Sequence, residues 1–271
     1  MPETTEKTFG SDFVPIARRQ LPMFFMIDTS GSMDGAKIGT IDTTMRELLP
    51  ELVGMGEADA DIRIAILTFS SGCEWMTTAP QQPEDIVWRK PTADGLTDLG
   101  DACKELSKKM SRKEFLASPG STFAPSVILL TDGEPTDNYK QGLEVLWANN
   151  WFKNAIKLAL PIGSGVTKEG RDVLAEFTGN PEAVLKNVNS AAQLKKMLKM
   201  VSVTSATIGS RSSINPETEE ENGNVENPQE GSSAKMTALL DEIKTVEDDS
   251  SWSAPSDGVD MSAVGYEDDE W

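Results

Sequence analysis

The chain has 271 residues and a formal net charge of −19, and its composition excludes several classes of protein. It contains no histidine and only two cysteines, which removes the common zinc sites and every catalytic dyad or triad built on histidine. The acidity argues against a nucleic-acid partner, because phosphate backbones are bound by Lys and Arg. No apolar run approaches the roughly 20 residues that cross a bilayer, and the N-terminus lacks the features of a secretory signal. We therefore expect a cytoplasmic protein that does not bind membranes.

Apolar runs and helical patterns alternate along the first three-quarters of the chain. Apolar runs that predict buried strands occupy 22–28, 61–70, 126–133, 155–163 and 184–188, and short edge strands are expected at 73–76 and 86–89. Helical patterns occupy 41–52, 97–110, 143–152, 167–178 and 194–201. We expect Pro50 to kink or interrupt the first helix. This alternation predicts an α/β fold, a mostly parallel sheet with helices on both faces.

The C-terminal part of the chain carries most of the negative charge. From Ser205 onward, 17 acidic residues stand against three basic ones, and the segment is rich in Ser, Asn, Gly and Pro. Such a composition buries too little apolar surface to offset the entropy of ordering, so we expect a disordered acidic tail. The predicted organisation is an N-terminal extension at 1–17, a folded domain at 18–204 and a low-complexity tail at 205–271.

Two features of the tail are candidates for a contact. Apolar residues at helical spacing predict a short helix at 234–246; its apolar positions are Met236, Leu239, Leu240 and Ile243. This helix either docks in a partner's groove or forms transiently without a role. Trp252 and Trp271 lie among acids beyond it. They are either anchors for a partner or idle residues of a solubilising tail, and tryptophan favours anchors.

Polar side chains follow three of the predicted strands or open the helices beyond them. Asp28, Ser30 and Ser32 come directly after the first strand, Thr97 opens a helix, and Asp132 ends the strand of SVILLTDG. In sheets of this kind ligands bind beyond the carboxyl ends of the strands. Two carboxylates and three hydroxyls suit a hard cation, above all Mg²⁺, with Mn²⁺ or Ca²⁺ as alternatives. Because the hydroxyls are neutral, the metal would keep enough positive charge to attract an anionic ligand.

These residues resemble the metal-ion-dependent adhesion site of von Willebrand factor A domains. The resemblance is carried by DTSGS, Thr97 and LLTDGEPTD and spans residues 18–204. It implies a Rossmann-like domain with a six-stranded sheet in the order 3-2-1-4-5-6. It further implies direct ligation by Ser30, Ser32 and Thr97, contacts through water from Asp28 and Asp132, and a sixth ligand from an Asp or Glu of a partner protein.

Within that superfamily, VILLTDGEPTDNYKQGLE and VTSATIGSRSS look most like the TerY-like proteins of bacterial tellurite-resistance and stress loci. That likeness implies an adaptor in a stress or defence system, with a kinase and a phosphatase as its partners. One departure concerns the loop before Thr97, where the family commonly has Gly-Gly-Thr and this chain has Gly95-Leu96-Thr97. Leu96 is expected to restrict the loop that brings Thr97 to the metal.

Several acids lie near the predicted site. We expect them to be solvated, to cap helices or to orient the metal ligands; they are Asp34, Asp98, Asp101, Glu134 and Asp137.

The sequence gives less support to an enzymatic function than to a binding function. An aspartyl-phosphate phosphatase needs a second Asp two residues after Asp28, where this chain has Ser30, and the stretch from Gly31 to Lys37 lacks the spacing of a phosphate-binding loop. A Mg²⁺-dependent hydrolase or phosphotransfer component is the alternative to a non-enzymatic adaptor, and a fold kept for packing without a metal is the third reading. A further hypothesis is that an acid of the tail occupies the open metal position and competes with the partner.

Overall fold

The computed structural model describes residues 19–54, 60–117 and 122–210 and, nearer the C-terminus, 237, 239–241 and 243–245. Its sheet has five strands in the order β3-β2-β1-β4-β5. The strands are β1 (Arg19–Asp28), β2 (Ala60–Ser70), β3 (Gly72–Trp75), β4 (Ser126–Thr131) and β5 (Ile156–Pro161). All neighbours are parallel except β2 and β3, which form an antiparallel hairpin. The N-terminal extension, Trp252 and Trp271 lie outside the described residues.

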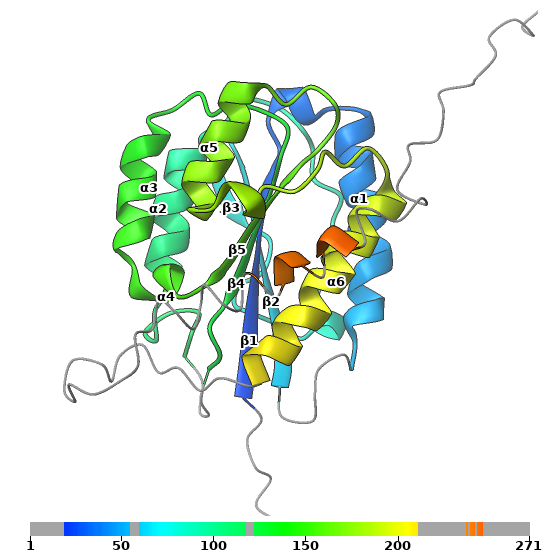
Figure 1. Ribbon diagram of the computed structural model, residues 1–271, viewed down its shortest axis with the longest axis vertical. Helices are drawn as coiled ribbons and strands as arrows, with labels where there is room; N and C mark the ends of the chain where they lie inside the picture. The colour runs from blue at the N-terminus through cyan, green and yellow to red at the C-terminus, as the bar shows by residue number, and fades with distance from the viewer. Residues whose placement is uncertain are drawn as a thin grey trace, which may run out of the picture.

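Helices cover both faces of the sheet. The helices are α1 (Ala36–Leu52), α2 (Leu99–Lys109), α3 (Tyr139–Ala148), α4 (Asn150–Lys153), α5 (Lys168–Thr178) and α6 (Ala191–Ser210). Figure 1 shows α1 and α6 on one side of the sheet and α2 to α5 on the other. Three short 3-10 turns, η1 (Gly31–Met33), η2 (Pro83–Asp85) and η3 (Pro181–Ala183), complete the described elements.

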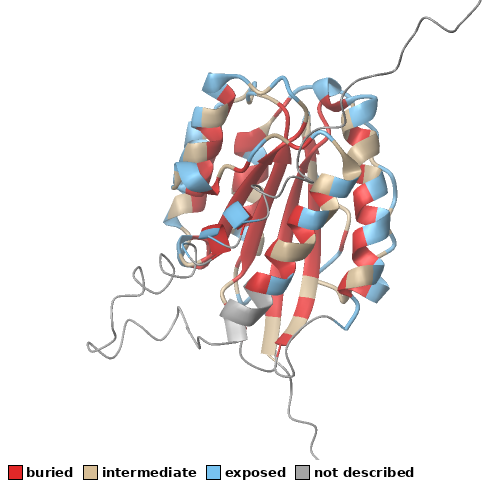
Figure 2. Ribbon diagram, turned by 45° about the vertical axis from the view of Figure 1, so that its right-hand side comes forward, coloured by how far each residue is buried: buried red, intermediate tan, exposed pale blue. Residues whose placement is uncertain are grey.

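Alternating side chains of the central strands supply two separate apolar clusters. Along β2, Ile62, Ile64 and Ile66 join the cluster under α1 and α6, whereas Leu67 and Phe69 join the cluster under α2 to α5. This is the alternation expected of a strand that is covered on both faces. Figure 2 shows the resulting sheet as almost continuously buried. The predicted α/β fold with a mostly parallel sheet is therefore confirmed.

The expected sixth strand is not formed. Residues 184–188 meet β5 only through isolated bridges, at Ala159 with Val184 and at Ile162 with Val188, and the register shifts by one residue between them. Between these bridges lies Pro161, whose carbonyl accepts from Val188 at 2.8 Å. The nitrogen of Pro161 faces the same edge and carries no hydrogen to donate, so a regular ladder cannot continue there.

Three local expectations were also wrong. Residues 86–89 form no strand; the indole of Trp88 instead donates to Asp42 of α1 at 2.8 Å and ties this segment to the helix. Pro50 lies in the last turn of α1 and does not interrupt it. The helix expected at 143–152 divides at Asn149, whose side-chain oxygen accepts from the backbone N–H groups of Trp151 and Phe152 and so caps α4.

The short helix expected in the tail lies against this chain's own domain. The described residues between 237 and 245 are helical, and Leu239, Leu240 and Ile243 are at most 2% exposed within the cluster under α1 and α6. Lys244 pairs with Glu182 at 3.1 Å. In Figure 1 the segment, drawn in orange, lies beside α6. Its apolar face therefore fills a place in the core of the same molecule.

The contact between α2 and α3 depends on two glycines, and this gives a first prediction. A Cβ built on Gly142 would lie 2.2 Å from the carbonyl oxygen of Gly100 and 2.4 Å from its Cα. Backbone atoms cannot yield as a flexible side chain can, so Gly142→Ala is expected to push the helices apart and cost about 2–3 kcal/mol of unfolding free energy. Chemical denaturation measures this loss.

Gly39 supplies the matched control. It lies inside α1, and a Cβ there meets nothing within 4 Å, so Gly39→Ala is expected to stabilise the domain by about 0.5–1 kcal/mol. Equal effects of the two alanines would show that helix propensity alone decides and that the helix crossing tolerates a side chain.

Candidate metal site

The candidate site begins at Asp28, the last residue of β1, whose side chain is fully buried. Its Oδ1 accepts a hydrogen bond from the backbone N–H of Ser30 at 2.8 Å, and its Oδ2 accepts one from the hydroxyl of Thr131 at 2.5 Å. Thr131 ends the neighbouring strand β4, so two strand ends hold this carboxylate between them. Burial raises the pKa of Asp28, the hydrogen bonds from Thr131 and Ser30 oppose the rise, and the charge of Asp132 adds to it.

A chain of hydroxyl groups leads from the turn after β1 to Asp132. The Oγ atoms of Ser30 and Ser32 are 3.1 Å apart, and the hydroxyl of Ser32 donates to Oδ1 of Asp132 at 2.8 Å. The turn is anchored by Met33, which is fully buried. The expected meeting of residues 28, 30, 32 and 132 at one edge of the sheet is therefore what the structure shows. This edge is the upper end of the molecule in Figure 1.

The loop that carries Thr97 lies against the same turn. The N–H of Gly31 donates to the carbonyl of Gly95 at 3.0 Å. Gly95 has a φ of +81°, and a Cβ there would come within 2.6 Å of the Ser71 hydroxyl, so the close approach needs glycine. Thr97 is buried, and its backbone pairs at both N–H and C=O with Thr136, each at 2.9 Å. Leu96 is 59% exposed, and the loop contacts the turn despite its bulk.

Lys37 also reaches the site, which the sequence reasoning did not predict. It is the second residue of α1. Its ammonium donates to the backbone carbonyl of Ser32 at 3.0 Å and to Oδ2 of Asp132, with which it forms an ion pair. The carboxylate of Asp132 is thus shared between a hydroxyl donor and a cation.

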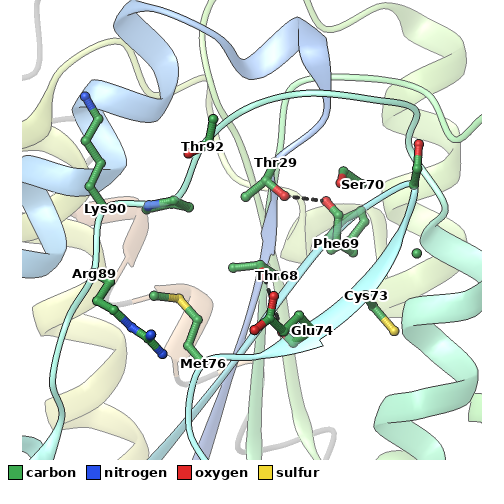
Figure 3. Close-up of a pocket in the computed structure, with 13 residues that line it drawn as sticks. Thr29, Thr68, Phe69, Ser70, Cys73, Glu74, Met76, Arg89, Lys90 and Thr92 are labelled. Carbon is green, nitrogen blue, oxygen red and sulfur yellow. Dashed lines mark hydrogen bonds between the residues drawn. The ribbon is translucent and has the colours of Figure 1, made fainter.

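A cleft of about 540 Å³ opens beside the turn, between the ends of β2 and β3 and the segment 89–92. Figure 3 shows Thr29 and Thr68 on one side of it and Arg89 and Lys90 on the opposite segment. The hydroxyl of Thr29 donates to the carbonyl of Phe69 at 3.0 Å, and both residues line the cleft. Cys73, an exposed free thiol, also lines it. The cleft adjoins the candidate site through Thr29, which lies between Asp28 and Ser30.

Comparison with known families decides the classification. A family model described as von Willebrand factor type A domain matches residues 23–200, about two-thirds of the chain. The chain belongs to the von Willebrand factor type A domain family. The predicted superfamily is thus confirmed, and the five-stranded sheet is this vWA domain's version of the fold.

One curated relative is 32% identical over 135 residues: inter-alpha-trypsin inhibitor heavy chain H4 of Sus scrofa. The match covers 46% of this chain and 14% of the relative. The vWA chain therefore spans only a small part of that protein's length.

Solved structures share the fold at low sequence identity. Proximal thread matrix protein 1 from the mussel byssus is 21% identical with a TM-score of 0.52, over 70% of this chain and 49% of that one. A second structure of that protein, with a zinc-occupied MIDAS motif, is 20% identical with a TM-score of 0.50, over 70% and 48%. A von Willebrand factor type A protein from Catenulispora acidiphila is 17% identical with a TM-score of 0.50, over 69% and 43%.

The acids near the vWA site each have another contact or lie in solvent. Asp98 accepts from the N–H of Gly72 at 2.9 Å, and Asp101 pairs with Lys104. Glu134 accepts from the hydroxyl of Thr167, and Asp34 is exposed. Asp137 accepts from the N–H of Asp101 at 3.2 Å, in the first turn of α2. The described contacts of the other four acids therefore serve turns, helix ends and a surface pair.

The sequence analysis did not predict two residues that contact the site, although a feature of the sequence pointed to each of them. Lys37 stands in the first turn of a helix, where the helix dipole favours acids, so a lysine there suggested an acidic neighbour. Thr131 directly precedes Asp132 and lies level with Asp28, because Ile27 pairs with Leu130 in the parallel register. The strand order implied by the resemblance makes β1 and β4 neighbours, but it does not give the register that sets Thr131 beside Asp28.

The donors of this site fit a hard divalent cation. They are oxygen atoms of carboxylates and hydroxyls gathered at one strand edge. Among the described residues, no group of three or more His, Cys, Asp and Glu side chains is placed to hold a metal ion, so a metal here would depend on hydroxyl ligands as well as on the two carboxylates. Neutral hydroxyls beside two carboxylates match the preference of Mg²⁺ and Mn²⁺ for oxygen ligands.

Proposed function

We propose that this vWA domain binds a divalent cation, Mg²⁺ in the cell, and through it the carboxylate of a partner protein. The proposed ligands are Asp28, Ser30, Ser32, Thr97 and Asp132. The observation that carries the proposal is the hydrogen-bonded path from Ser30 through Ser32 to Asp132, at 3.1 and 2.8 Å. That path gathers oxygen atoms from two strand ends that are about 100 residues apart in sequence.

The proposed ligands have two different roles. Ser30, Ser32 and Thr97 offer neutral oxygen atoms, while Asp28 and Asp132 supply the negative charge that attracts the cation. Thr131 holds Asp28 in orientation by its hydrogen bond. When bound, the cation supplies Lewis acidity and an open position that an external acid can fill. We propose an adaptor without catalytic activity, because the chain contains no histidine that could activate a hydroxyl or thiol nucleophile.

The surroundings favour an acidic partner segment. Leu96 offers an exposed apolar side chain next to the metal loops, and the adjacent cleft presents Arg89 and Lys90. A segment with one acid on the metal and further acidic residues beside it would meet these basic side chains. Such complementarity would act mainly on the rate and the selectivity of association.

The cellular setting is proposed from the TerY-like resemblance alone. On that basis the domain acts in the cytoplasm of a bacterium, within a stress or defence system, and its partners include a kinase or a phosphatase. Among the described residues, no helix is both long enough and apolar enough to cross a membrane.

A capture experiment tests the adaptor function. The immobilised chain is incubated with native lysate in Mg²⁺ or in EDTA, and the variant Ser30→Ala/Ser32→Ala is compared with wild type. We expect a partner that is retained only with Mg²⁺ and only by wild type. Ser107→Ala is the matched control, since its hydroxyl donates to Val145 on α3, away from the site. Identical capture in EDTA would reject the metal-dependent adaptor.

The hydrolase alternative is tested with the wild-type chain and one further variant. Turnover of phosphoester substrates is measured with and without Mg²⁺ for wild type and Asp28→Ala. Mg²⁺-dependent turnover that disappears with Asp28→Ala would replace the adaptor by an enzyme.

A further inference from the structure

The ammonium of Lys37 occupies a defined position at the metal site. It donates to the carbonyl of Ser32 at 3.0 Å and pairs with Oδ2 of Asp132. The side chain of Asp132 is 1% exposed and that of Lys37 is 31% exposed. A nearly buried carboxylate therefore has a cationic partner from its own chain.

The aliphatic part of Lys37 is also held in place. Gly163, just after β5, has a φ of +83°, and a Cβ built there would lie 3.0 Å from Cε of Lys37 and 3.6 Å from its Cδ and Cγ. The absence of a side chain at Gly163 thus leaves the space in which the lysine stem lies. Two acceptors and this contact together fix where the ammonium is placed.

We propose that Lys37 is a tethered cation that balances Asp132 in the metal-free domain and competes with the divalent metal for it. The inference rests on the proposed metal site and adds a residue that sets the site's affinity. Oδ1 of Asp132 already accepts from Ser32, and Oδ2 accepts from Lys37. A divalent cation that draws on Asp132 therefore has to displace the ammonium or bind beside a like charge.

The competition has two consequences. Without metal, the ammonium of Lys37 neutralises the charge of Asp132. An unpaired carboxylate that is almost fully removed from solvent would otherwise destabilise the folded domain. When the metal binds, displacing the ammonium costs free energy and lowers the apparent affinity for the metal. A higher metal concentration is then needed to fill the site than if Lys37 were neutral. The displaced ammonium would remain tethered at the rim, where a partner's acid approaches.

The test is a Mn²⁺ titration of the full chain by isothermal calorimetry, comparing wild type with Lys37→Met. Methionine keeps an unbranched stem beside Gly163 and removes the charge. We expect Mn²⁺ to bind Lys37→Met about five- to tenfold more tightly, the scale expected for a partly exposed unit charge near the site. Lys37→Gln is a second neutral variant in case the methionine protein folds poorly.

Thermal unfolding provides a second readout. In EDTA, Lys37→Met is expected to unfold at a lower temperature than wild type, because Asp132 loses its partner, and saturating Mn²⁺ is expected to raise its unfolding temperature by more than it raises that of wild type. Lys113→Met makes the same change of net charge beyond the far end of α2. This control is expected to bind Mn²⁺ as wild type does.

The outcomes separate this inference from the proposed function. Equal or weaker Mn²⁺ binding by Lys37→Met, with wild type still binding, overturns the competition and leaves the metal site standing. The same gain in Lys113→Met overturns it too, because overall charge would then explain the effect. No binding by any of these proteins overturns both. Binding by Lys37→Met alone supports the competition in its strongest form.

Discussion

Removing the hydroxyls of Ser30 and Ser32 together is expected to weaken Mn²⁺ binding by at least about a hundredfold. Loss of an outer partner of a metal ligand commonly costs 10- to 100-fold, and this change removes two proposed ligands outright. It also breaks the path to Asp132, since Ser32 donates to that carboxylate at 2.8 Å. Calorimetric titration of Ser30→Ala/Ser32→Ala measures the loss directly.

The fold should survive that change. Ser32 is exposed, and the side chain of Ser30 is paired with Ser32, whereas the anchor of the turn is the buried Met33. Because Ser30 is buried and Asp132 loses the hydrogen bond from Ser32, we expect the unfolding temperature in EDTA to fall by about 2–4 °C, the effect of losing one hydrogen bond in a domain of this size. A variant that binds Mn²⁺ with wild-type affinity would show that the serines are turn residues only.

Thr97→Ala gives the graded comparison. Its loop reaches the turn through backbone contacts, which the substitution keeps, so the expected loss is about tenfold. A loss as large as that of the double serine variant would make Thr97 a ligand of equal rank, and no loss would remove it from the site.

How far the site follows from sequence depends on the kind of contact. Asp28, Ser30, Ser32 and Asp132 could be placed together because each stands at the carboxyl end of a buried strand, and strand ends of a parallel sheet share one edge. Lys37 could not be placed in the same way. Its position depends on how α1 leaves the turn and on the space left by Gly163, which is over 120 residues away.

The fold shows the same division. The strands and their two faces follow from local alternation, as with Ile64 and Leu67 of β2. The missing sixth strand and the place of the tail helix do not, because both depend on non-local partners. Pro161 prevents regular strand pairing only if its nitrogen faces the next strand. Which way the nitrogen faces depends on how β5 is paired with its neighbours, and this is not evident from the local sequence. The apolar face of the tail helix predicts burial without naming the surface that covers it.

Detaching the tail helix is expected to destabilise the domain by about 2–4 kcal/mol, the cost of losing a large buried side chain from a core. Leu239, Leu240 and Ile243 are at most 2% exposed and share one apolar cluster with Leu185 and Val188. We expect Leu240→Asp to release the helix, because an unpaired charge cannot stay in that cluster. For a domain of this size, the unfolding temperature should fall by roughly 5–12 °C.

The stability that substitutions in the tail helix can remove has an upper limit. If the helix detaches while the rest of the domain stays folded, no substitution within it can cost more than the free energy of docking. Deleting residues 211–271 should therefore lower the stability as much as Leu240→Asp does. Asp241→Ala, an exposed position in the same helix, should leave it unchanged.

Hydrogen exchange locates the effect. The segment 184–188 pairs with β5 only at isolated bridges, so the backbone amides there should gain exchange when the helix over them leaves, while those of β1 and β4 stay protected. If Leu240→Asp destabilises the chain and the deletion does not, the aspartate acts by disturbing the core and the helix contributes no docking energy. If both lower the stability equally and expose 184–188, the tail segment is an integral part of the folded vWA domain, because its three apolar side chains complete a core that α1 and α6 leave open.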